Sequence, residues 1–225
     1  ILYCEEQFLK GKNVRPQFPG RNVGLMFGLE SSLHPFIGHP SYKEISHLSL
    51  NEKLSIMRDP AFKQKILNES PSFREDLQKA AQEQKSNKTK EEIKAEAEIG
   101  KKLISNYETQ FILSDPPNYE PTREDSIAYL AEQRNQSEEE VIYDELIKDD
   151  GKSLIYACFT PYENHKLKFV ETFYKLKSSV AGGSDGGAHC GLICDASMPT
   201  TNLSHWARDR SAGNKIPLEL IIRKQ

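Results

Sequence analysis

Ser184-Asp185-Gly186-Gly187-Ala188-His189 is the stretch around which the rest of this sequence can be organised. The preceding residues 179–183 are small and uncharged, as expected for a strand buried on both faces. Asp185 would then stand at the end of that strand, where barrel enzymes built of parallel strands carry their catalytic groups. Asp185 is therefore a candidate general base or metal ligand. The same residues are also typical of an ordinary turn, which the local pattern alone favours.

The glycines of this stretch suit both the catalytic interpretation and the turn interpretation. Without a Cβ, Gly186 and Gly187 let the backbone turn sharply and approach a bound molecule closely. We expect Gly186 to line a substrate site if Asp185 is catalytic.

The sequence that follows strengthens the catalytic interpretation. Residues 190–200 read CGLICDASMPT, residues 205–210 read HWARDR, and residues 217–225 read PLELIIRKQ. Together with SDGGAH they resemble the C-terminal part of the D-aminoacylase (N-acyl-D-amino-acid deacylase) branch of the amidohydrolase superfamily. The resemblance is weaker at residues 15–17 and 33–42, and it is slight between residues 51 and 106.

The resemblance implies an α/β fold, namely the last two or three strand–helix units of a (β/α)8 barrel, interrupted by a mainly helical insertion. It implies metal-dependent hydrolysis of an amide bond in an N-acyl-D-amino acid. In that family the SDG aspartate ends the last strand, binds or faces the metal and shuttles protons. Carried over, this makes Asp185 both catalytic residue and metal ligand, with zinc as the cofactor.

The family's other metal ligands have no counterpart here. Members bring a His-x-His, a cysteine or acidic bridging ligand and two further histidines from earlier strands, whereas this sequence has six histidines and no His-x-His. We expect an internal piece of a longer enzyme, inactive and nearly zinc-free by itself, whose partners are the substrate and the remaining barrel segment. Unpaired strands would make the isolated piece self-associate. The alternative is a non-catalytic fragment or divergent scaffold.

Candidate substrate-binding residues surround the expected barrel mouth. Residues 13–18 predict a strand, and the resemblance implies that Arg15, Gln17 and Arg21 face the pocket, although solvated loop positions are an equal alternative. The resemblance also implies that Arg208 lies near the rim of the active site and pairs with a substrate carboxylate, a role that Arg210 would serve equally well. Trp206, between them and His205, is expected to fill core space.

Residues 153–159 are β-branched, aromatic and uncharged, and they predict a buried strand. Asn164 ends the loop after this strand and is predicted to bind substrate. A helix around residues 167–176 would return the chain to the strand before Asp185, giving a βαβ unit with a right-handed crossover. His189, Cys190 and Cys194 would make a soft metal site, but buried cysteines packing as small apolar groups explain them better.

Helix signals dominate residues 41–150. Helix starts are predicted at Ser49 with Glu52, at Asp59-Pro60, at Thr122, and at Ser137 with Glu140. Residues 73–106 predict amphipathic helices. Residues 1–40 are expected to form a strand–helix unit and a long irregular mouth loop, residues 41–150 a helical insertion acting as a lid, and residues 151–225 the terminal βαβ unit. A strand at 108–114 would lie on the barrel rim.

Composition narrows the partners. The net charge of −3 and pI near 6.1 give no electrostatic footprint for nucleic acid, and no apolar run is long enough to span a membrane. Mean hydropathy is −0.64. The four cysteines do not have the spacing of a secreted disulfide framework, which predicts a reducing, cytoplasmic setting.

Overall fold

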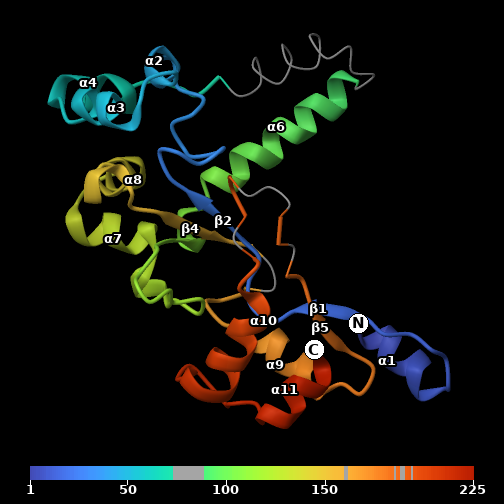
Figure 1. Cartoon of the computed structure of the whole chain (residues 1–225). Coiled ribbons are helices and arrows are strands. Elements are labelled where there is room, and N and C mark those ends of the chain that lie inside the picture. The colour runs from blue at the N-terminus through green and yellow to red at the C-terminus, as the bar shows by residue number, and fades with distance from the viewer. Residues whose placement is uncertain (73–88, 160–161, 185, 188–190, 194) are drawn as a thin grey trace. The chain divides into compact units, whose positions relative to one another are not determined.

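Contacts divide this mixed α/β chain into two units, each built from separate stretches of sequence (Figure 1). The computed structural model describes every residue except 73–88, 160–161, 185, 188–190 and 194. The first unit comprises Ile1–Leu25, Ser114–Arg123 and Cys158–Gln225, and the second comprises Met26–Leu113 and Glu124–Ala157. This division does not follow the continuous segments 1–40, 41–150 and 151–225 expected from the sequence.

Two parallel strands organise the first unit. Strand β1 (Gln17–Pro19) pairs with β5 (Val180–Gly182), in a register that sets Gln17 beside Val180 and Pro19 beside Gly182. Helix α9 (Lys168–Lys175) leads into β5 and packs on β1, because the rings of Phe173 and Tyr174 lie 5.8 and 4.9 Å from that of Phe18. The helix before β5 thus covers the strand with which β5 pairs.

Short helices complete the first unit: α1 (Leu2–Leu9), α10 (Met198–Thr201), the π-helical η4 (Asn202–Asp209) and α11 (Leu218–Lys224). Trp206 is fully buried, its ring lies 5.5 Å from Tyr174, and its indole N–H donates to the Gly20 carbonyl. The prediction of a core Trp206 is confirmed, and Gly11 directly follows Lys10, the residue that caps the end of α1. Gly11 has φ of 85°, a left-handed conformation that glycine adopts without strain.

A three-stranded sheet has the order β2-β4-β3, formed by β2 (Gly24–Phe27), β4 (Ile155–Cys158) and β3 (Gln110–Ile112). Strand β3 runs antiparallel to β4, with Phe111 opposite Tyr156. All four residues of β4 are buried, as the apolar run at 153–159 predicts. The strands predicted at 108–114 and 153–159 are therefore confirmed, but each is shorter than predicted.

The predicted βαβ unit is wrong. Strand β4 is the central strand of its sheet, so β2 and β3 occupy both of its edges and no edge is left for β5. Strand β5 pairs with β1 in a different sheet. The expectation of a long irregular mouth loop within residues 1–40 is also wrong in part, because β2 forms there. Its three apolar residues, Leu25, Met26 and Phe27, lie between Gly24 and Gly28, and these glycines interrupt the strand pattern in the sequence.

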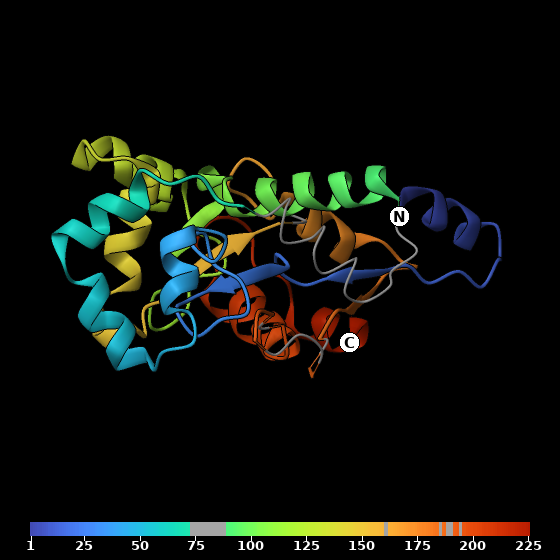
Figure 2. The same cartoon turned by 90° about the horizontal axis from the view of Figure 1, so that it is seen from above.

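The helices of the second unit are α2 (Pro40–Ile45), α3 (Leu50–Met57), α4 (Pro60–Leu67), α6 (Lys90–Ile104), α7 (Ile127–Arg134) and α8 (Glu138–Leu146), with 3₁₀ turns η1 (Tyr107–Thr109), η2 (Arg123–Asp125) and η3 (Asp149–Gly151). Figure 2 shows α4 (cyan) beside α8 (yellow), where Lys63 bridges Glu140 at 2.9 Å and Asp144 at 2.8 Å. The buried Tyr143 hydroxyl donates to the Met57 carbonyl at 2.8 Å. Within the described ranges, no helix combines the length and apolarity needed to cross a bilayer.

Three of the four helix starts predicted from the sequence are found. Ser49 and Glu52 form the full capping box of α3, and the Asp59 carboxylate accepts from the Ala61 N–H. Ser137 caps α8, but the Glu140 side chain pairs with Lys63, so the reciprocal half of that box is not formed. The predicted Thr122 cap is wrong, because η2 intervenes and Ser126 caps α7.

Candidate active site

The carboxyl ends of β1 and β5 form the candidate site. In a parallel pair both carboxyl ends lie at the same edge, so the segments that begin at Gly20 and Gly183 leave the sheet side by side. Gly183 has φ of 87°, and a Cβ built there would lie 3.2 Å from the Met198 sulfur. The left-handed turn at Gly183 therefore directs the chain into Ser184 and the motif.

The central residue of the motif lies outside the described residues. Asp185 is among the positions not described, and so are His189, Cys190 and Cys194 of the alternative soft metal site. The catalytic and metal-binding roles of Asp185 stay predictions. Gly186, predicted to line the substrate site, is exposed, and a Cβ on it would lie 3.4 Å from the Ala196 Cβ.

Gln17 is the predicted substrate-binding residue that lies against β5. It is exposed, and a Cβ built on Gly182 would come within 3.2 Å of the Gln17 Cδ and Oε1 atoms. The Gln17 amide thus lies over Gly182, two residues before Ser184, and a larger residue at 182 would displace it. The sequence correctly suggested a polar side chain at this strand, but the contact with Gly182 depends on the strand register.

Arg21 does not face a solvated pocket, contrary to expectation. Its side chain is 0% exposed and its Nη1 lies 3.2 Å from Oδ1 of Asp195, which is 6% exposed. The guanidinium lies 4.0 Å from the centroid of the Tyr119 ring, and Nη2 donates to the Ser197 hydroxyl at 3.3 Å. Since a buried guanidinium needs charged and polar partners, Arg21 ties residues 195–197 to the end of β1.

The remaining predicted substrate-binding residues have other surroundings. Arg15 is exposed and stacks over Phe8 at 4.3 Å, and Asn164 is exposed with φ of 50° in a turn. Arg208 has a 75% exposed side chain whose Nε donates to the Asp209 carboxylate at 2.6 Å. No contact described for these three residues reaches the carboxyl edge of β1 and β5, so the structure does not gather them into one site.

Arg210 is likewise not free for a substrate carboxylate. It is 5% exposed and holds the buried Glu120 in a bidentate pair, with Nε–Oε2 and Nη2–Oε1 distances of 2.9 and 3.0 Å. The His205 imidazole Nε2 lies 2.9 Å from the same Oε2, and the Glu171 carboxylate lies 3.2 Å from Nη1 of Arg210. Glu120 is therefore the centre of a buried polar network in the first unit.

The network changes the ionisation of Glu120. Burial alone would raise its pKa, but hydrogen bonds from His205 and Arg210 and the guanidinium charge hold the pKa at about 2. No local sequence pattern indicates the role of Glu120, because it stands in a proline-rich loop and its partner Arg210 is 90 positions away.

The described residues do not supply a metal centre. Within the described part of the chain, no group of three or more His, Cys, Asp or Glu side chains is arranged to hold a metal ion. No protein-family model, characterised protein or solved structure matches this chain.

Proposed function

We propose that this chain is part of a metal-dependent amidohydrolase that cleaves the amide bond of an N-acyl-D-amino acid. The observation that carries the proposal is the parallel pairing of β1 with β5, which sets the start of the SDGG motif at a carboxyl edge. Enzymes built on parallel barrels place their catalytic groups at that edge. The resemblance of residues 184–225 to D-aminoacylases supports the same conclusion.

The proposed architecture is a partial (β/α)8 barrel. Helix α9 precedes β5 and packs on Phe18 of β1, an arrangement of helix over parallel strands that barrels repeat. Among the described residues β1 and β5 have only each other as partners, whereas a closed barrel gives every strand two neighbours. The missing neighbours would come from the remaining barrel segment of the longer protein.

Asp185 is the proposed proton shuttle. Its carboxylate would accept a proton from the water that attacks the amide carbonyl, and would return that proton to the amine nitrogen as the C–N bond breaks. The products are a carboxylic acid and a D-amino acid. Gln17, whose amide lies over Gly182, is proposed to hydrogen-bond the substrate at the same edge.

Arg21 is assigned an indirect part in the same site. Through Asp195 and Ser197 it fixes the segment that follows the motif, and a Cβ built on Gly186 would lie 3.4 Å from Ala196 of that segment. Arg21 would therefore act as a positioning residue for the Asp185 loop.

The zinc implied by the resemblance does not fit the described residues. They form no ligand cluster, and Asp185 alone would be one oxygen donor where zinc sites use about four donors. The ligands of a zinc ion would have to come from the rest of the longer protein. The roles proposed for Asp185 and Gln17 depend only on proton transfer and hydrogen bonding.

Replacing Asp185 by asparagine in the full-length enzyme tests the proposal. Asp185→Asn keeps the shape but removes the base, so kcat/KM against a panel of N-acyl-D-amino acids should fall by about 10²–10⁴. The thermal midpoint should stay nearly unchanged. Asp150→Asn is the matched control, because the Asp150 side chain is 81% exposed and asparagine accepts its left-handed φ of 52°.

Two results would overturn the assignment. Near-normal turnover by Asp185→Asn would show that the catalytic carboxylate is elsewhere. No hydrolysis of any panel member by the wild-type enzyme, with zinc supplied, would favour the non-catalytic scaffold.

A further inference from the structure

The second unit contains a cavity of about 190 Å³. It lies between the segment before α2, the chain after α4, the end of α6 and the start of α8. Its apolar lining consists of Pro35, Phe36, Leu67, Pro71 and Ile104. An apolar cavity of about 150 Å³ is large enough for benzene, so this one admits a molecule with one ring and one substituent.

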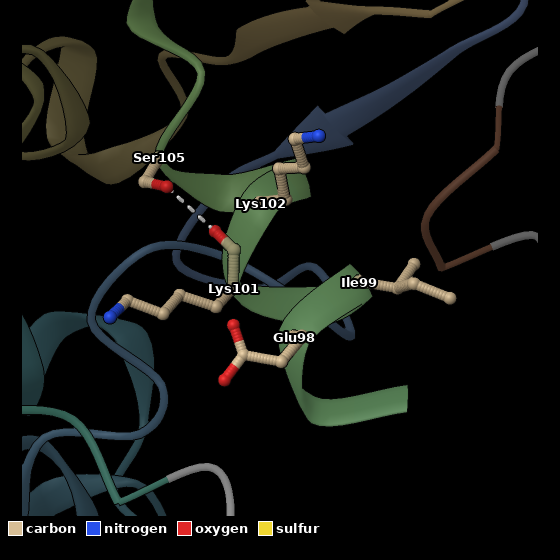
Figure 3. A pocket seen from close by; sticks show the side chains of 5 residues that line it. All are labelled: Glu98, Ile99, Lys101, Lys102 and Ser105. Atoms are coloured by element: carbon tan, nitrogen blue, oxygen red, sulfur yellow. Dashed lines mark hydrogen bonds between the residues drawn. The ribbon is translucent and has the colours of Figure 1, made fainter. Parts of the chain in front are cut away.

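The hollow beside α6 in Figure 3 is of a different kind. Its described lining residues all come from the end of one helix, and the side chains of Glu98, Ile99 and Lys102 diverge from one another. The Ser105 hydroxyl is already bonded to the Lys101 carbonyl, at 2.9 Å. A surface groove on one helix offers no convergent groups, whereas the 190 Å³ cavity is lined from four segments.

The charged groups of the cavity favour a cation. Glu69 and Glu139 line it and are half-buried, whereas Lys101, its cationic lining residue, is exposed. Since water and salt screen an exposed charge more than a half-buried one, the two carboxylates dominate the field inside. Each is anchored: Glu69 accepts from the Ser41 N–H at 2.9 Å and Glu139 from the Tyr107 hydroxyl at 2.7 Å.

His39 also lines the cavity and is 7% exposed. Burial lowers the pKa of His39 most, whereas the Phe36 backbone and the Glu69 and Glu139 carboxylates raise it. Both carboxylates therefore act on the same side chain of the cavity lining.

We propose that this cavity binds a small primary ammonium ion with an apolar body. The ammonium group would donate to the carboxylates of Glu69 and Glu139. The apolar body would lie against Phe36, Leu67 and Ile104. This site lies wholly within the second unit and is independent of the proposed hydrolysis.

Three probes of one shape test the proposal on the full chain: benzylamine, the neutral benzyl alcohol and the anionic benzoate. Titration calorimetry should show saturable binding of benzylamine, at least about tenfold tighter than that of benzyl alcohol, because charge-assisted hydrogen bonds are the stronger ones. Benzoate should not bind. Equal binding of the alcohol, or no saturable binding of benzylamine, would refute the site.

Variants separate the cavity from general surface charge. Glu139→Gln still accepts from Tyr107, but should weaken benzylamine binding about tenfold or more. Glu138→Gln is the matched control, since it removes the neighbouring charge of α8 outside the cavity lining, and should change binding less than about twofold.

A substitution at the exposed Lys101 tests the charge preference in a second variant, so that the test does not depend on the folding of Glu139→Gln. Lys101→Ala should leave benzylamine binding unchanged or stronger, because it removes a competing cation. Loss of benzylamine binding in Lys101→Ala, or equal losses in the Glu138 and Glu139 variants, would contradict a cation site.

Discussion

Glu120→Gln should destabilise the first unit by about 3 kcal/mol. Glu120 is 5% exposed and accepts two hydrogen bonds from the buried Arg210. Removing one partner of a buried ion pair costs roughly 3–5 kcal/mol, because the other charge is left without compensation. Arg210 keeps Glu171 at 3.2 Å, so we expect the lower end of that range.

The ionisation of Glu120 gives the same magnitude. Its pKa falls from the ordinary 4.5 to about 2 in the folded chain, which at about 1.4 kcal/mol per pH unit corresponds to about 3 kcal/mol. Because the folded pKa is the lower one, this stabilisation is fully present above pH 4.5 and is lost as the pH falls toward 2. The difference in unfolding free energy between wild type and variant should therefore narrow by about 2 kcal/mol between pH 7 and pH 3.

Urea denaturation at the two pH values measures this difference, and a thermal midpoint lowered by about 6–12 °C at pH 7 should accompany it. Glu219→Gln, at an exposed position in the first turn of α11, is the control and should change stability by less than about 0.5 kcal/mol. A Glu120→Gln chain as stable as wild type at pH 7, or a deficit independent of pH, would refute the reasoning.

Three further predictions follow from the fold. Phe18→Ala should lower the unfolding free energy by about 3–5 kcal/mol, measured by urea denaturation, because Phe18 is 1% exposed and contacts two aromatic rings of α9. Ser49→Ala should cost about 1 kcal/mol through loss of the α3 cap, and Ser46→Ala clearly less, in the same assay. Light scattering should show the isolated chain self-associating, since β1 and β5 have unpaired edges among the described residues; a monodisperse monomer would count against a barrel piece.

Local chemistry determined the parts of the fold that the sequence predicts well. The starts of α3 and α4 follow from Ser49 and Asp59, because a capping side chain acts on backbone groups two or three residues away. The buried β4 follows from its uninterrupted apolar run, and the burial of Trp206 from its size and apolarity. These signals are complete within a few consecutive residues.

Strand partners and buried charges were decided only by the tertiary structure. The sequence predicts β4 and β5 as neighbours because they are consecutive, yet a strand has two edges, and those of β4 are taken by β2 and β3. The sequence predicts that Arg21 faces the substrate pocket or solvent and that Arg210 is free to pair with a substrate carboxylate. Each instead lies buried against a carboxylate, Asp195 or Glu120, from a distant segment. A charge enters the interior only where folding supplies its counter-charge, and no local pattern of residues records which distant segment that will be.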